Sequence, residues 1–361
     1  MLTSLRTQNF RSIRDASVKL GQVNLFIGPN NSGKSNFLKG IEVAAALLSN
    51  TNKDGNIGRN NLSKSLQNRP YDSPATVAFI TGFRGNNGEE AIVTTALKDD
   101  TISQYIAASV KVLNNQGVIN PELLDGQFQA TPAEIRQATQ GTIIYNINPE
   151  NLRASAGLKN MLRPSADGAD LVMFLFYLEQ NYRAQAKRIQ TDFRECIRDL
   201  VHVSTAPVPD EPGKLKLKFF DKNDVCYWAE EVSEGVLYFL ALLCIVHQPD
   251  PPKLLLLEEP EKGIHPRRIK EVMDFIFELA ELRGIQIILT SHSPYVVDHF
   301  ADIPEYISVF DRENDETVIR NAGDLISESN AQLAAEGKPP IRCTDSLGEH
   351  WVSGFLGGVP A

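Results

Sequence analysis

The sequence predicts an α/β protein in which helices cover both faces of a largely parallel sheet. Three observations carry this prediction. Two apolar strands without polar alternation occur at Leu254–Leu257 and Ile285–Leu289, an amphipathic helix lies between them, and a third apolar strand at Val23–Ile27 runs through a glycine-rich loop into a helix. Strands that are apolar throughout are typical of parallel sheets, because helices pack on both sides of such sheets.

Length and composition indicate a globular chain. The 361 residues include 45 acidic and 36 basic side chains, so the net charge is −9, and 42% of the residues are apolar. This length allows two or three domains with a sizeable core. The composition excludes a disordered chain, a collagen-like repeat and a disulfide-dense scaffold. The acidic total argues against a wholly basic surface for nucleic acid, although one basic face could still bind phosphates locally.

The sequence contains no signal for a membrane span or for export. Its longest apolar run, Val236–Val246, is far shorter than the ~20 residues of a membrane helix. The first residues lack the basic and apolar regions of a signal peptide, and the four cysteines stand far apart without metal-ligand spacing. We therefore expect a cytoplasmic protein with no membrane contact, no zinc site and no disulfide framework.

The elements near the start of the chain follow from hydrophobic periodicity. Apolar residues over 2–20 indicate strands before the buried strand 23–27, and helical spacing then extends from Ser35 to Leu48. A polar loop over 49–61 ends this helix.

A hairpin and an insertion are predicted next. The runs 77–83 and 91–97 flank a glycine-asparagine turn and predict two antiparallel strands. Residues 98–165 contain four prolines and mixed signals, which we interpret as an inserted, loop-rich subdomain without assigned elements.

Helical periodicity returns over 170–200 and again after Ser233, and a helix over about 267–283 ends at Gly284. The first of these segments has a basic face, formed by Arg183, Lys187, Arg188, Arg194 and Arg198. This face is either solvated or a contact for nucleic acid or an acidic partner. An alternating strand, 214–219, places three lysines on one side.

The strongest functional signal is the octamer Gly28-Pro29-Asn30-Asn31-Ser32-Gly33-Lys34-Ser35, which matches G-x-x-x-x-G-K-[ST] at every fixed position. It lies between a buried strand and a helix, where a phosphate-binding loop belongs. Its glycines let backbone N–H groups surround the phosphates, and the helix N-terminus adds its positive end. In this role Lys34 contacts the β- and γ-phosphates and Ser35 ligates Mg²⁺.

Two further motifs follow apolar strands. Leu254–Leu257 ends in Glu258 and Glu259, and carboxylates at this position support Mg²⁺ and orient or deprotonate the attacking water. His292 stands in Thr290-Ser291-His292-Ser293-Pro294, directly after the strand 285–289. A histidine at the carboxyl end of a parallel strand lies in the ligand crevice, and beside the other two motifs it is expected to contact the γ-phosphate.

Together these motifs resemble those of ABC-type ATPases of the SMC/OLD-like class. The resemblance also covers the opening Asn9-Phe10-Arg11-Ser12, the sequence Val232-Ser233-Glu234-Gly235, and Glu258-Glu259-Pro260-Glu261. The closing segment, residues 347–358, is similar to the tail of short stand-alone ATPases in this group.

This resemblance implies a P-loop NTPase with an ABC-ATPase-like mixed sheet, an antiparallel β subdomain and an inserted helical lid. It divides the chain into residues 1–100 with the phosphate loop, 101–230 as the lid, and 231–361 with the remaining motifs. ATP and Mg²⁺ are the expected ligands. The implied ATP-contacting residues are Arg11, Gly28, Pro29, Asn30, Asn31, Ser32, Gly33, Lys34, Ser35, Asn36, Ser233 and Gly235.

The resemblance also assigns roles. Ser35 and Glu258 would hold Mg²⁺, Glu259 would be the catalytic carboxylate, and Lys34 and His292 would act on the γ-phosphate. Ser233 and Gly235 correspond to a signature motif that closes over nucleotide bound by another subunit, so a homodimer with ATP at its interface, or a higher oligomer, is implied.

Three features depart from the ABC pattern. The signature motif reads Val-Ser-Glu-Gly-Val, Glu258 stands where Asp is usual, and His265 lies near the position of the usual D-loop Asp. No Q-loop glutamine is assigned.

Two functions remain open. In the first, the dimer controls a separately encoded effector protein, for instance a nuclease, in bacterial genome defence. In the second, it is a DNA-binding ATPase of repair or maintenance whose hydrolysis DNA stimulates. A transporter subunit fits the motifs less well. The 361 − 292 = 69 residues after His292 are too few for the nuclease domain of OLD proteins.

Overall fold

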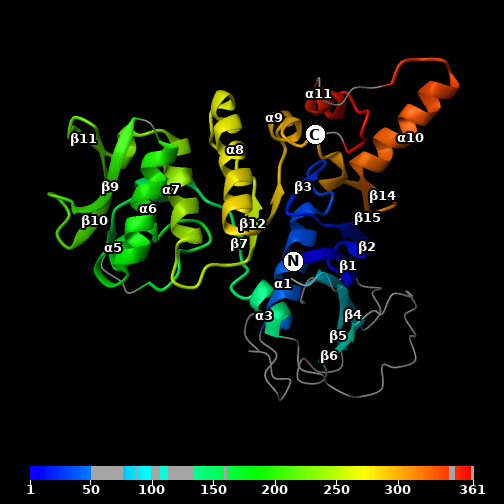
Figure 1. Ribbon diagram of the computed structural model, residues 1–361, viewed down its shortest axis with the longest axis horizontal. Helices are drawn as coiled ribbons and strands as arrows, with labels where there is room; N and C mark the ends of the chain where they lie inside the picture. Colours follow the sequence, from blue (N-terminus) through cyan, green and yellow to red (C-terminus); the bar gives the residue numbers. More distant parts are fainter. Residues whose placement is uncertain are drawn as a thin grey trace. The chain divides into compact units, whose positions relative to one another are not determined.

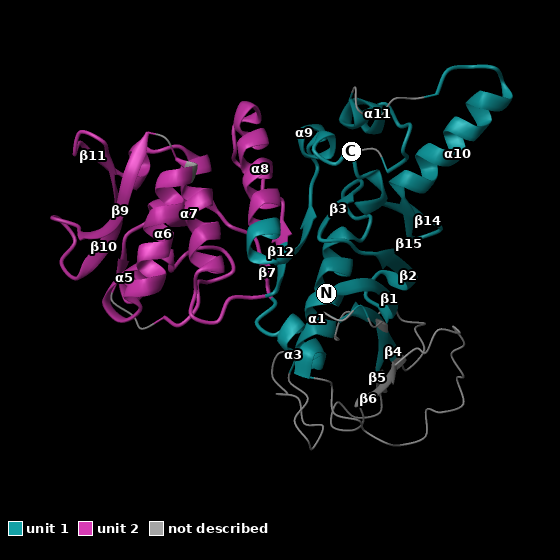
Figure 2. Ribbon diagram, in the orientation of Figure 1, with its two compact units in different colours: residues 1–142, 253–256, 280–361 teal, residues 143–252, 257–279 magenta. Residues whose placement is uncertain are grey.

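The computed structural model describes residues 1–49, 76–85, 88, 90–98, 106–112, 133–157, 161–197, 199–340 and 346–358. The chain forms two compact units, which Figure 2 shows in different colours. Unit 1 contains residues 1–142, 253–256 and 280–361, and unit 2 contains residues 143–252 and 257–279.

A six-stranded mixed sheet contains the apolar strands that the sequence predicts (Figure 1). Its order is β15 (Glu316–Asn321), β14 (Ile307–Glu313), β3 (Val23–Ile27), β13 (Gln286–Thr290), β12 (Leu254–Glu258) and β7 (Ile144–Tyr145). Both β13 and β14 pair in parallel with β3, whereas β15 is antiparallel to β14. Every residue of β3 and β13 is buried, as expected for strands inside an α/β sheet.

The helix after the glycine loop, α1 (Lys34–Ser49), buries an apolar stripe against this sheet. Its Phe37 ring contacts the rings of Phe26 and Phe310, and the three aromatic side chains are fully buried. Aromatic contacts of this kind each add about 0.5–1.5 kcal/mol beyond area burial. They fix the start of α1 behind the glycine loop.

Unit 1 also contains a five-stranded antiparallel sheet, with the order β2 (Ile13–Lys19), β1 (Leu2–Phe10), β4 (Thr76–Arg84), β5 (Glu90–Lys98) and β6 (Ile106–Val112). The predicted hairpin is confirmed, since β4 and β5 pair over their whole length. The polar loop predicted over 49–61 lies mostly outside the described residues.

The remaining helical elements of unit 1 are α3 (Ala133–Thr139), α9 (Pro294–Asp298), η3 (Pro304–Tyr306), α10 (Ala322–Ala335) and α11 (Leu347–Val352). In unit 1, α11 packs beside α9 (Figure 1).

Unit 2 combines helices with a small antiparallel sheet. Its helical elements are α4 (Pro149–Arg153), α5 (Leu171–Asn181), α6 (Arg183–Cys196), η2 (Ala229–Glu231), α7 (Glu234–Val246) and most of α8 (Pro266–Arg283). Its sheet consists of β8 (Ala156–Gly157), β9 (Leu200–Pro207), β10 (Lys214–Asp221) and β11 (Cys226–Trp228), with β10 in the middle. Helix α7 is buried along its whole length after Glu234, so it forms the core of this unit.

One prediction in this region needs correction. The helical periodicity over 170–200 belongs to two helices, which are separated at Tyr182, and Leu200 already starts β9. Tyr182 has φ −132° and ψ 61°, which is not helical. Because α5 and α6 pack against each other and against α7, both helices carry apolar stripes, and the periodicity alone does not reveal the break.

Among the described residues, no helix has the length and apolarity that a membrane span requires.

Candidate functional site: a phosphate loop and a signature helix

The glycine loop has a backbone that only small residues allow. Gly28 has φ +144° and Gly33 has φ +106°, both in the region that favours glycine, and Asn31 between them has φ +62°. A Cβ at Gly28 would overlap the carbonyl oxygen of Phe310, and one at Gly33 would overlap the Thr317 hydroxyl. The loop is therefore pressed between α1 and the β14–β15 hairpin, and α1 begins directly after it, at Lys34.

Lys34 already points into this loop. Its Nζ donates hydrogen bonds to the carbonyl oxygens of Gly28 and Pro29, at 2.8 Å each, and only 6% of the residue is exposed. The loop thus folds around an ammonium group whose donors can turn to phosphate oxygens.

Two polar atoms near the loop suit an anionic ligand. Within the described part of the chain, the buried Ser32 Oγ and Arg11 Nε have no hydrogen-bond partner. Unsatisfied buried polar atoms are costly and commonly mark a ligand or water position. With the N-terminus of α1 and Lys34, they give a donor set that fits phosphate.

The β1–β2 turn carries Arg11 to the start of α1. Arg11 has φ +52°, and its Nη1 donates to Asn36 Oδ1 at 3.1 Å, while Asn36 Nδ2 donates to Ser12 Oγ at 2.8 Å. Ser12 Oγ in turn lies 3.2 Å from Thr317 Oγ1. The structure thus brings Arg11 and Asn36, both expected to contact ATP, to one side of the phosphate loop.

His292 follows the end of β13. Since β13 is parallel to β3 and next to it, His292 and the phosphate loop both follow the carboxyl ends of adjacent strands in unit 1. Ser291 Oγ accepts a hydrogen bond from the Ser293 N–H at 2.9 Å, which shapes the turn between β13 and α9.

The paired carboxylates end β12 and belong to unit 2. Glu258 Oε2 accepts a hydrogen bond from Asn146 Nδ2 at 3.2 Å. Burial raises the pKa of the hydroxyl of Tyr145, which precedes Asn146 in the chain, to about 12. Glu259 has φ +48°, a conformation that residues other than glycine seldom adopt and that recurs at functional sites.

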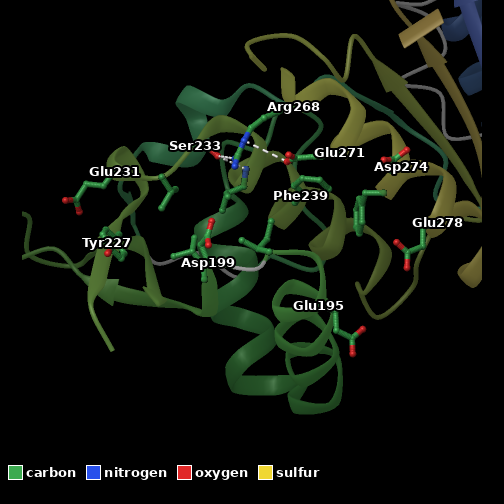
Figure 3. Close-up of a pocket in the computed structure, with 15 residues that line it drawn as sticks. Glu195, Asp199, Tyr227, Glu231, Ser233, Phe239, Arg268, Glu271, Asp274 and Glu278 are labelled. Atoms are coloured by element: carbon green, nitrogen blue, oxygen red, sulfur yellow. Dashed lines mark hydrogen bonds and ion pairs between the residues drawn. The ribbon is translucent and has the colours of Figure 1, made fainter. Parts of the chain in front are cut away.

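The predicted signature motif, Ser233–Gly235, starts the core helix of unit 2. Ser233 is the N-cap of α7, and its Oγ accepts from the Val236 N–H at 3.5 Å. Arg268 Nη1 donates to the same Oγ at 2.6 Å, and its side chain passes over Gly235. Glu234, between them, lies 3.5 Å from Arg153 Nη1. Two arginines therefore surround the signature, and Figure 3 shows the contact of Arg268 with Ser233.

Ser233 and residues along α7 line a groove of about 790 Å³ (Figure 3). Ser233 and Arg268 form one part of its wall, whereas Phe239 and Phe275 are apolar residues within it. Most of its charged lining is acidic: Glu195, Asp199, Glu231, Glu271, Asp274 and Glu278.

Residues 23–298 match the protein family described as "AAA domain, putative AbiEii toxin, Type IV TA system". This match spans more than half of the chain and includes the glycine loop, the signature, the paired glutamates and His292. The chain is an ABC/SMC-like P-loop ATPase of this family. The mixed sheet of the structure, together with solved structures of similar fold, confirms the predicted fold class.

Solved structures agree with this assignment at the level of the fold. The ATPase resembles the SMC head domain from Thermotoga maritima, with a TM-score of 0.51 and 14% identity over 89% of this chain and 98% of that one. It also resembles an SMC head bound to the C-terminal winged-helix domain of ScpA, with a TM-score of 0.55 and 15% identity over 88% and 96% of the two chains.

Curated relatives match over shorter stretches. The energy-coupling factor transporter ATP-binding protein EcfA2 of Streptococcus agalactiae is 33% identical over 26% of this chain and 29% of its own length. The lantibiotic transport ATP-binding protein SrtF of Streptococcus pyogenes is 27% identical over 32% of this chain and 48% of its own length. The ATPase therefore spans less than half the length of these relatives.

Sequence reasoning missed Asn146 and Arg268, which contact the predicted site residues Glu258 and Ser233. It also missed Thr317, which lies against the predicted site residue Gly33 and near Ser12. Asn146 lies 112 residues from Glu258, Arg268 lies 35 from Ser233, and Thr317 lies 305 from Ser12. Each belongs to a segment with no motif of its own, so the sequence offers no signal for them.

Proposed function

We propose that the ATPase is a nucleotide-gated homodimer that controls a separately encoded effector protein in bacterial genome defence. The observation that carries the proposal is the N-terminus of α7, where Ser233 is the N-cap and Arg268 donates to its hydroxyl. A helix N-terminus with an arginine beside it favours an anion such as phosphate, so the chain has a second phosphate-binding element besides the glycine loop. Membership in a family described by a toxin–antitoxin system supports the defence context. The SMC head that binds ScpA supports a protein partner.

In this proposal, residues 28–36 and Arg11 cradle the triphosphate, and Lys34 leaves the carbonyls of Gly28 and Pro29 for the phosphate oxygens. The Ser35 hydroxyl and the Glu258 carboxylate are oxygen donors of the kind that Mg²⁺ prefers. Bound Mg²⁺ supplies neutralising charge at the phosphates.

Glu259 is the proposed general base that orients and deprotonates water, and His292 donates a hydrogen bond to the γ-phosphate. Ser233 and Gly235 of a second copy complete the site. ATP binding then favours the closed dimer and hydrolysis reopens it, so the effector responds to nucleotide state.

We place the ATPase in the cytoplasm, where ATP is available. The free thiols of Cys226 and Cys244 support a reducing compartment.

The composite site is tested by complementation between two inactive variants. Lys34→Ala removes the phosphate loop's ammonium, and Ser233→Asp keeps a good N-cap but places a negative charge against the γ-phosphate. Each variant alone is expected to lack ATPase activity. An equimolar mixture should recover about a quarter of wild-type turnover, because half of the dimers are mixed and each has one intact site of two.

Ser233→Thr serves as the matched control, since it retains the hydroxyl and the N-cap, and it should stay active alone. A mixture as inactive as its components, at concentrations where wild-type dimers form, would show that the two motifs do not meet across subunits.

The second candidate, a DNA-binding ATPase, is favoured by one surface. Arg183, Lys187, Arg188 and Arg194 are exposed along α6, as the predicted basic face requires, while Arg198 lies outside the described residues. Phosphate contacts of this type weaken steeply with salt.

For this alternative, ATP turnover should rise several-fold with duplex DNA at low salt and lose the stimulation near ~200 mM salt. Replacing the four exposed basic residues of α6 by glutamine should abolish the stimulation without changing basal turnover. Lys222→Gln with Lys338→Gln, at two other exposed sites, is the control. Equal ATP turnover with and without duplex DNA would contradict this alternative and favour control of a protein effector.

A further inference from the structure

The segment 347–358 contacts the start of the phosphate loop in unit 1. Gly358 has φ +56°, and a Cβ on it would lie 3.5 Å from Gly28 Cα and 2.9 Å from the Phe310 carbonyl oxygen. The same carbonyl oxygen is the atom that a Cβ on Gly28 would overlap. Three backbones, at Gly28, Phe310 and Gly358, therefore meet in close approach at the loop residue whose carbonyl holds Lys34.

Trp351 fixes Gly358 in this place. Its Nε1 donates to the Gly358 carbonyl oxygen at 2.9 Å, and its side chain is fully buried. Consecutive turns between them are closed by backbone hydrogen bonds from Gly354 to Trp351 and from Gly357 to Gly354. Hydrogen bonds thus hold the chain in shape from Trp351 to Gly358.

At its other end the segment 347–358 holds the helix that follows His292. The Gly348 N–H donates to Asp298 Oδ1 at 2.8 Å, and a Cβ at Gly348 would overlap the carbonyl of Pro294. Figure 1 shows α11 against α9. The segment 347–358 therefore lies against both the phosphate loop and α9, the helix that follows His292.

We propose that the segment 347–358 positions the phosphate loop for ATP, with Trp351 and Gly358 as positioning residues that act through Gly28. The proposal rests on ATP binding at the phosphate loop. A loop that must aim several N–H groups at one ligand loses apparent affinity in proportion to the time it spends in other shapes. Gly358 lies close to Gly28 and to the Phe310 carbonyl oxygen, so we expect it to limit those shapes.

The test compares two glycines in left-handed conformations. Gly358→Ala would place a Cβ 2.7 Å from Val309 Cγ1 and 2.9 Å from the Phe310 carbonyl oxygen, which pushes the segment from Gly28. Gly337→Ala is the matched control, since Gly337 has φ +71° but nothing within 4 Å of its Cβ position. It introduces the same kind of backbone strain without a steric clash.

Binding of a fluorescent ATP analogue and steady-state kinetics are measured on the full chain. Gly358→Ala should raise the Kd and the KM for MgATP about tenfold, as for a loop competent one-tenth of the time, with kcat within about twofold. Gly337→Ala should leave all three unchanged. A loss of fold alone would not produce this split between KM and kcat.

Equal Kd values for Gly358→Ala and Gly337→Ala would overturn the proposal. If Gly358→Ala does not fold, Trp351→Phe decides, because it retains a buried ring but removes the hydrogen bond to Gly358; a Kd equal to that of the wild type would then overturn it. Lys34→Ala distinguishes a failure of this proposal from a failure of the proposed ATP site. If Lys34→Ala binds ATP with wild-type affinity, ATP does not bind at the phosphate loop.

Discussion

Lys34→Ala should lower ATP affinity at least about 100-fold, because it removes the charged donor that serves the β- and γ-phosphates. In the structure this ammonium is buried and donates to the carbonyls of Gly28 and Pro29, so it already lies at the loop when nucleotide arrives. Titration of the purified chain with ATP by calorimetry measures the effect.

The substitution also leaves two carbonyl oxygens without their donor, so folding needs its own check. Thermal unfolding of the variant should remain cooperative. Lys39→Ala is the control: Lys39 lies on the same helix, pairs with Glu42 and is 32% exposed at its side chain. It should bind ATP like the wild type. ATP binding by Lys34→Ala with unchanged affinity would show that the glycine loop is not the phosphate site.

Glu259→Gln should separate ATP binding from hydrolysis. The amide has the shape of the carboxylate but cannot take a proton from water, and the loss of a general base costs about 10²–10⁴ in turnover. ATP would still bind at the phosphate loop. We therefore expect the variant to accumulate as an ATP-bound dimer, which light scattering on a sizing column with ATP and Mg²⁺ would detect.

Two other glutamates make the result specific. Glu258→Gln changes the proposed Mg²⁺ ligand, so it should raise the Mg²⁺ concentration that half-maximal turnover requires. Glu281→Gln changes an exposed residue and should behave like the wild type. Wild-type turnover by Glu259→Gln would show that Glu259 is not the general base. If the variant stays monomeric with ATP and Mg²⁺, the proposed nucleotide-gated dimer is wrong.

Much of the fold follows from local sequence patterns. The apolar runs at 23–27, 254–257 and 285–289 are buried strands, and the glycine-lysine octamer stands between a strand and a helix. These features are local, since side-chain periodicity encodes burial and the glycines encode backbone shape within a few residues. The break at Tyr182 is missed for the same reason, because two packed helices present one continuous periodicity.

The partners of the site residues belong to the tertiary structure. Asn146 at Glu258, Arg268 at Ser233, and Gly358 at Gly28 join segments that lie far apart in the chain. No local propensity specifies such pairs, because they depend on which strands and helices become neighbours after folding. The octamer and the paired glutamates thus identify the chemistry, whereas the packing of the whole chain decides which side chains hold those groups in position.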